Sequence, residues 1–212
     1  MVNWSESWRH SGWHVLAAGG GVVFLVLTWL VVSRNAGLEA VDAAGMRLAY
    51  GLRSPALTAV MQAATWLGTG LAYVVVLAAG WSLVRRQDSK PVALAVASLV
   101  GADIVRTGIN LLVHRPRPPR AEWLTMASLY SFPSGHAALA GTAFGLAAWL
   151  LWRWNHRVGR WAVVGAVVAG LAVACSRVYL GVHWPSDVLG GIAFALVWTC
   201  LTILAARRIV VS

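Results

Sequence analysis

Six long apolar runs constrain the fold of this chain more than any other feature of its sequence. They lie at about Trp13 to Ser33, Thr69 to Val84, Pro91 to Val113, His136 to Trp152, Trp161 to Cys175 and Pro185 to Ala206. Each is close to the roughly 20 residues that an α-helix needs to cross a bilayer. We therefore predict an all-α, polytopic membrane protein with six transmembrane helices.

The composition indicates the same environment independently. Of the 212 residues, 59% are hydrophobic and only 11% are charged, whereas a soluble domain carries about a quarter charged residues. No charged tail or low-complexity linker marks a second domain, so residues 1–212 are expected to form a single membrane-embedded domain. Cys175 and Cys200 lie in different apolar segments at different expected depths, and no disulfide is predicted.

The stretch between the first two runs departs from this pattern. Glycines and a proline interrupt residues 38–67, and apolar residues alternate at helical spacing with Glu39, Asp42, Arg47 and Arg53. We predict an interfacial amphipathic helix here, followed by a half-buried one. The second part can also merge with the next spanning helix through residues 68–70, and the sequence leaves this boundary open.

The net charge of +10 is explained by membrane orientation and by basic residues clustered in a few polar stretches of the C-terminal half. A basic protein can bind nucleic acid, but no basic aromatic stripe or soluble binding module is present, so no nucleic-acid partner is expected. If the N-terminus is cytoplasmic, the inner loops hold Arg9, Arg85, Arg86, Lys90, Arg153, Arg157, Arg160, Arg207 and Arg208. This distribution agrees with the positive-inside rule and predicts that both termini are cytoplasmic.

Three short polar stretches interrupt the apolar C-terminal half. They are Arg115-Pro116-Arg117-Pro118, Pro133-Ser134-Gly135-His136 and the segment from Ser176 to Asp187. Polar groups near lipid cost free energy and are normally kept for function. Each stretch lies at the end of an apolar run, and the predicted topology places all three on the outer face.

Together, these stretches resemble the signature of the type 2 phosphatidic acid phosphatase superfamily. Its pattern is Lys-x6-Arg-Pro, then Pro-Ser-Gly-His, then Ser-Arg-x5-His-x3-Asp. The second and third motifs match at every defining position, and the first matches in Arg117-Pro118. Asn110 stands in place of the lysine. The resemblance covers roughly the C-terminal half of the chain.

Several of these residues are suited to binding phosphate, as the resemblance also implies. Arg117 and Arg177 carry planar, permanently charged forks that can grip phosphate oxygens. Ser134 and Gly135 stand where the fourth spanning helix should begin, and the unpaired N–H groups of a helix N-terminus favour an anion. Asn110 can add a neutral hydrogen-bond donor. The alternative is a serine N-cap with interfacial arginines.

His183 and Asp187 are candidates for covalent chemistry. Pro185 between them marks a helix start, and a carboxylate in the first turn can fix the imidazole tautomer and stabilise its cation. The resemblance implies that His183 forms a phosphohistidine, while His136 protonates the leaving oxygen and then activates water. A purely structural hydrogen bond between His183 and Asp187 is the alternative.

We expect neither a metal nor another cofactor. Two histidines and an aspartate can form a three-ligand site, but four nearby arginines, Arg115, Arg117, Arg120 and Arg177, would repel a cation. The resemblance also implies metal-independent catalysis.

Other basic residues near the motifs have two possible roles. Arg106 either replaces the charge of the missing lysine or forms an ion pair with Asp103, three residues before it, and we favour the ion pair. Arg115 and Arg120 either contact a second phosphate or headgroup or are solvated loop charges.

We therefore predict a membrane lipid phosphatase that acts on a lipid phosphate or diphosphate at the outer face, in a bacterial inner membrane. Undecaprenyl diphosphate, phosphatidylglycerol phosphate, phosphatidic acid and lipid A phosphate are candidate substrates. The alternatives are a lipid phosphotransferase that uses the same site and a non-catalytic membrane binding or transport protein. The sequence leaves the oligomeric state open.

Overall fold

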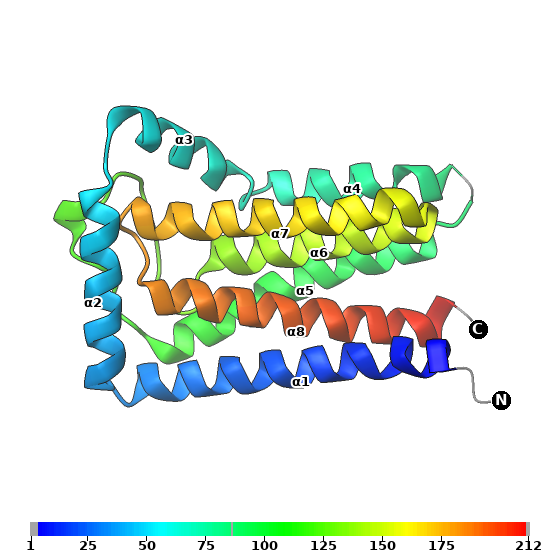
Figure 1. Ribbon diagram of the computed structural model, residues 1–212, viewed down its shortest axis with the longest axis horizontal. Coiled ribbons are helices and arrows are strands. Elements are labelled where there is room, and N and C mark those ends of the chain that lie inside the picture. The colour runs from blue at the N-terminus through cyan, green and yellow to red at the C-terminus, as the bar shows by residue number, and fades with distance from the viewer. Residues whose placement is uncertain (1–3, 86, 211–212) are drawn as a thin grey trace.

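A computed structural model describes residues 4–85 and 87–210, which form helices and connecting loops without a strand (Figure 1). The elements are α1 (Trp4–Val32), α2 (Ala36–Gly51), α3 (Pro55–Trp66), α4 (Leu71–Val84), α5 (Lys90–Val113), the 3-10 turn η1 (Arg120–Glu122), α6 (Gly135–Trp154), α7 (His156–Tyr179) and α8 (Pro185–Val210). The predicted all-α fold is confirmed.

In the part of the chain that the structure describes, five helices are long and apolar enough to cross a membrane: α1, α5, α6, α7 and α8. The remaining predicted span, from about Thr69 to Val84, differs from these five. At 14 residues, α4 is only about 21 Å long, which is short for a hydrocarbon core of about 30 Å. It follows α3 across a bend of 60°, and the two helices together pass the same test. The half-buried segment thus belongs with the second span, the possibility that the sequence left open.

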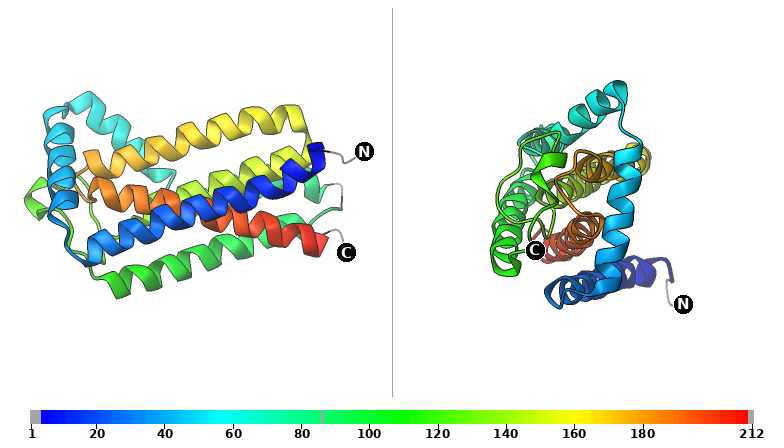
Figure 2. Two further views of the ribbon diagram at one scale, coloured as in Figure 1. Left: turned by 60° about the horizontal axis from the view of Figure 1, so that its bottom comes forward. Right: turned by 90° about the vertical axis from the view of Figure 1, so that its left-hand side faces the viewer.

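The long helices run side by side, whereas α2 lies crosswise over one end of the bundle (Figures 1 and 2). Asn35 begins α2 by accepting a hydrogen bond from Leu38 N, and Ser54 begins α3 in the same way. The beginning of α1 and the end of α8 lie at the opposite end of the bundle (Figure 1). The ends of α5 and α7 and the beginnings of α6 and α8 meet beneath α2.

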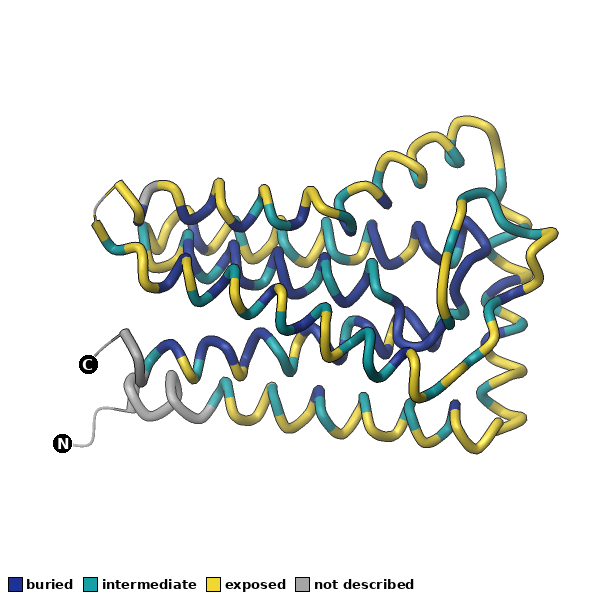
Figure 3. Tube along the Cα trace, turned by 180° about the vertical axis from the view of Figure 1, so that it is seen from behind, coloured by how far each residue is buried: buried dark blue, intermediate teal, exposed yellow. Residues whose placement is uncertain are grey.

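The centre of the bundle is α6, which packs against α4, α5, α7 and α8. Its many alanines and glycines let the neighbouring backbones approach closely. A Cβ added at Gly141, for example, would lie 2.8 Å from Cβ of Ala195 in α8. In the most apolar stretch, 56% of the residues of α6 are buried, compared with 11% for α1. Figure 3 shows this contrast, which leaves α1 with an apolar surface suited to lipid.

Candidate active site

The three polar stretches meet at the end of the bundle that α2 covers. Arg117 lies in the loop between α5 and α6, and Ser134 to His136 form the start of α6. Arg177 lies in the last turn of α7, and Asp187 lies in the first turn of α8. The pairing of helix ends in an antiparallel bundle therefore brings together residues that are about 70 positions apart.

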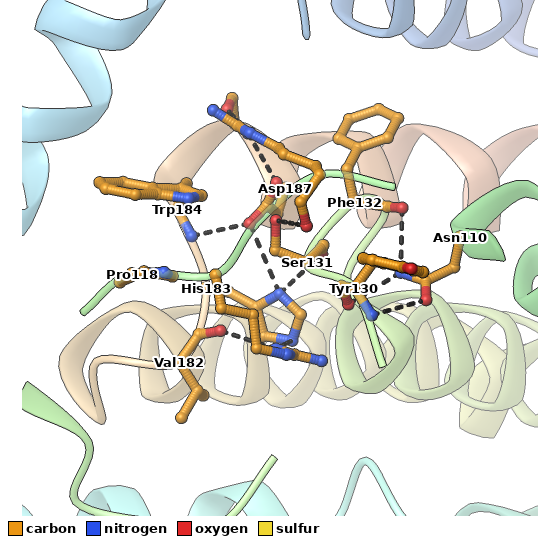
Figure 4. Close-up of polar contacts among 12 residues, drawn as sticks. Asn110, Pro118, Tyr130, Ser131, Phe132, Val182, His183, Trp184 and Asp187 are labelled. Atoms are coloured by element: carbon orange, nitrogen blue, oxygen red, sulfur yellow. Dashed lines mark hydrogen bonds and ion pairs between the residues drawn. The ribbon is translucent and has the colours of Figure 1, made fainter. Parts of the chain in front are cut away.

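His183 is buried in the loop between α7 and α8, and its Nδ1 atom has two neighbours. Nδ1 lies 2.9 Å from the Ser131 carbonyl oxygen and 3.6 Å from Asp187 Oδ2 (Figure 4). Because a carbonyl only accepts hydrogen bonds, Nδ1 carries the proton and donates it to Ser131. This contact fixes the tautomer that was expected to depend on Asp187, and Asp187 adds negative charge beside the ring. The lone pair lies on Nε2.

The Nε2 atom of His183 faces Arg117. Arg117 Nη1 lies 3.0 Å from His183 Nε2 and donates to the Val182 carbonyl at 2.7 Å. Its other nitrogens donate to the Leu129 and Ser128 carbonyls at 3.1 and 2.6 Å. These contacts hold the guanidinium beside His183 Nε2, where its charge can stabilise an anion.

Burial lowers the pKa of His183 to about 4; Asp187 acts in the opposite direction, and the charges of Arg117 and Arg177 lower it further. The imidazole is therefore neutral at neutral pH and can act as a nucleophile. Burial also lowers the pKa of Arg117, partly offset by Asp187.

Two buried polar groups near His183 and Arg117 have no hydrogen-bond partner among the described residues. They are the Ser134 hydroxyl and Nε of Arg177, although Arg177 Nη1 donates to Thr65 Oγ1 of α3 at 2.5 Å. Ser134 is the N-cap of α6, yet its side chain makes no capping bond. A buried polar group left unpaired costs about 1–3 kcal/mol, so an anion that accepts from both would suit this site.

His136 is the second residue of α6 and lies near His183 and the positive charges of Arg177 and Arg117. The break between α3 and α4 packs directly against it. A Cβ added at Gly68 would lie 3.0 Å from both the Cβ and the carbonyl oxygen of His136. The bent span thus forms one wall of the site.

Asn110 has a different position from the one expected of a phosphate ligand. It is buried, its Nδ2 atom donates to the Tyr130 and Phe132 carbonyls at 2.9 and 3.0 Å, and its Oδ1 accepts from Tyr130 N (Figure 4). Both amide protons are used in shaping the loop that carries Ser131. A contact with phosphate would require the amide to leave these partners and stays a prediction.

The preferred role of Arg106 is confirmed. Its Nη2 lies 2.7 Å from Asp103 Oδ1. Its guanidinium also lies beside the start of α6, since a Cβ added at Gly135 would be 3.1 Å from Arg106 Cζ. Arg120 lies over the Trp123 ring, 5.9 Å from its centroid.

Arg115 is not a solvated loop charge, and a contact with a second phosphate or headgroup stays a prediction. Its Nη1 donates to Asp187 Oδ1 at 2.6 Å and to Ser186 Oγ at 2.7 Å, and its Nη2 donates to Asp42 Oδ2 at 2.6 Å. From the sequence we predict an interfacial helix around Asp42 and no role for it in the site, yet only 1% of this residue is exposed. The sequence feature that could have pointed to Asp42 is an acidic residue among the small apolar residues of α2.

Among residues 4–85 and 87–210, no group of three or more His, Cys, Asp or Glu side chains is placed to hold a metal ion. The predicted independence from metal stays a prediction. The site contains His183, the carboxylate of Asp187 and the guanidinium groups of Arg117 and Arg177.

Known proteins share both this sequence pattern and this fold. Residues 91–210 match the family model described as the PAP2 superfamily. The chain is 30% identical to phosphatidylglycerophosphatase B of Bacillus subtilis (strain 168) over 181 residues, which cover 82% of this chain and 87% of that protein. It is also 30% identical to undecaprenyl-diphosphatase BcrC of the same strain over 131 residues, covering 60% of this chain and 64% of that protein.

A solved structure is similar along nearly its whole length. It is the crystal structure of a transmembrane PAP2 type phosphatidylglycerolphosphate phosphatase from Bacillus subtilis, with a TM-score of 0.83 and 25% sequence identity. The alignment covers 91% of this chain and 96% of that one, so it includes helices that precede the region matched by the family model.

Proposed function

Because the chain belongs to the PAP2 superfamily, we propose that this integral membrane protein is a phosphatase that hydrolyses a lipid phosphate or diphosphate through a phosphohistidine on His183. The observation that carries the proposal is the position of His183 Nε2, 3.0 Å from Arg117 Nη1. The unpaired groups of Ser134 and Arg177 lie in the same site. A candidate nucleophile and several groups that can bind an anion are thus brought together at the same end of the bundle.

In the first step, the lone pair of His183 Nε2 forms a bond to phosphorus as the bond from phosphorus to the lipid oxygen breaks. His136 gives a proton to the leaving oxygen. Arg117, Arg177, Ser134 and the N–H groups at the start of α6 stabilise the charge on the transferring group. The positive charge that develops on the imidazole is stabilised by Asp187 and by the Ser131 carbonyl.

In the second step, water attacks the phosphohistidine. His136, now neutral, removes a proton from the water, the bond from nitrogen to phosphorus breaks, and inorganic phosphate leaves. His183 regains its lone pair on Nε2. No metal ion takes part in this scheme.

The substrate classes that we propose are phosphatidylglycerol phosphate and undecaprenyl diphosphate, because relatives that act on them match most of this chain. Phosphatidic acid and lipid A phosphate remain further candidates. We place the site at the outer surface of a bacterial inner membrane, with both termini in the cytoplasm. Two findings support this placement: the charge distribution, and the position of the site at the end of the bundle opposite the beginning of α1 and the end of α8 (Figure 1).

The test is phosphate release by purified protein in detergent from these four lipids, with EDTA present and no acceptor lipid added. The His183→Ala variant should lose turnover but elute normally on size exclusion, whereas His14→Ala, an exposed histidine of α1, should behave like the wild type. Release of phosphate by His183→Ala at the wild-type rate would overturn the mechanism. Release that depends on an added lipid acceptor would indicate phosphotransfer instead.

A further inference from the structure

A buried ionic cluster joins α2 to the first turn of α8, directly behind His183. Arg115 lies between Asp42 and Asp187, with N–O distances of 2.6 Å to each carboxylate. Asp42 also accepts from Ser186 N at 2.9 Å and from Ser186 Oγ at 2.6 Å. Both carboxylates are almost completely buried, at 1% and 0% exposure.

The composition of this cluster leaves it with a net charge of −1. It contains two carboxylates and one guanidinium, and a guanidinium keeps its proton in proteins. If Asp42 were absent, Arg115 would neutralise Asp187 and the cluster would carry no net charge. Because a second carboxylate shares the arginine, Asp187 can still act as an anion 3.6 Å from His183 Nδ1.

Helix α2 is also packed tightly against this part of the molecule. A Cβ added at Gly45 would lie 2.6 Å from Cγ of Pro185, the first residue of α8. The Arg115 guanidinium lies over the Trp184 ring, 5.8 Å from its centroid. Arg115 and both of its partners are therefore held in place, and α2 belongs to the site although it lies outside residues 91–210, the region matched by the family model.

We infer that Asp42 and Arg115 are positioning residues that set the negative charge behind His183 and so stabilise its phosphorylated, cationic form. This inference rests on the proposed function, because it concerns the charge formed in that reaction. When phosphorus bonds to Nε2 while Nδ1 keeps its proton, the imidazole ring gains one positive charge, which balances the −1 of the cluster. Asp42 acts at a distance through Arg115 and touches no reacting atom.

Other charged groups also face His183. They are Arg117 in the loop before α6, Arg177 of α7 and His136 of α6. The same groups and the same substrate are present in every variant in which Asp42 or Arg115 is replaced. Differences between variants in the pH dependence of kcat/KM therefore report the charge of the cluster.

The test compares Asp42→Asn with Arg115→Gln by measuring kcat/KM against pH. Asp42→Asn makes the cluster neutral. It should move the acid limb of the profile, the pH range in which kcat/KM falls as the pH is lowered, to lower pH. It should also lower kcat by about tenfold or more. Arg115→Gln gives the cluster a charge of −2 and should move the limb to higher pH. Each shift should be about half a pH unit or more, since a charge at 4–6 Å shifts a pKa by about 1–3 units and Asp42 acts from behind Arg115.

The double variant should restore a limb close to that of the wild type, because its cluster again carries −1. Glu39→Gln, which removes an exposed carboxylate of the same helix, is the matched control and should change neither kcat nor the limb. If one of the single variants does not fold, the other still tests the inference, because the sign of its own shift in pH is predicted.

Equal shifts in one direction, or no shift in a folded variant, would overturn the inference and leave the cluster with a structural role. That outcome is distinct from failure of the proposed function, in which the wild-type protein would release no phosphate from any of the lipids.

Discussion

Replacing Arg117 with lysine keeps the charge at the site but removes the planar guanidinium. The three nitrogens of the arginine side chain contact the His183 ring and donate hydrogen bonds to the carbonyls of Val182, Leu129 and Ser128. A lysine has one nitrogen with three donors and cannot reproduce these directions. At least one carbonyl partner or the phosphate contact must therefore be lost.

The size of the effect follows from this contact. A hydrogen bond to a charged group contributes about 1.5–3 kcal/mol, and about 1.4 kcal/mol corresponds to a tenfold change in rate. Arg117→Lys should therefore lower kcat/KM by about tenfold to about 150-fold. The assay is phosphate release from a lipid phosphate in detergent at neutral pH, with size exclusion to confirm folding.

The matched control is Arg47→Lys, at an exposed position of α2 over the same end of the bundle. It should change kcat/KM by less than about twofold, because a surface arginine contributes little. An Arg117→Lys variant as active as the wild type would refute the role of the guanidinium fork and reduce Arg117 to a point charge.

Three further predictions test the site, the fold and the topology. Ser134→Ala should lower kcat/KM by about tenfold without lowering Tm, because the hydroxyl makes no capping bond; a matching loss of Tm would contradict this. Gly181→Ala should lower the free energy of unfolding by about 1–3 kcal/mol, since φ is 78° and the new Cβ would clash with the carbonyl oxygen of Glu122. Gly51→Ala has open space around the new Cβ and should be neutral in thermal unfolding. A cysteine at Ala121 should react with an impermeant thiol reagent outside intact cells and one at Asn155 should not; the reverse pattern would invert the topology.

The sequence by itself determined the parts of this protein that depend on local composition. Apolar runs of membrane-spanning length predicted the long helices because a helix in lipid needs a minimum number of apolar residues in succession. The resemblance pointed to the residues of the polar stretches, and Pro185 marked the start of α8. Even there, hydropathy alone did not resolve the second span, since it cannot register the 60° bend between α3 and α4.

The tertiary structure decided how the polar groups are paired. Asp42 and Arg115 are 73 positions apart, and nothing in the sequence around either one shows that they share a buried ionic cluster. The Ser131 carbonyl fixes the tautomer of His183, yet a backbone oxygen has no signature in a sequence. Asn110 likewise stands at a motif position, but its amide is bonded to the loop before α6. Partners of this kind depend on where helix ends meet, and that position is set by packing over the whole bundle.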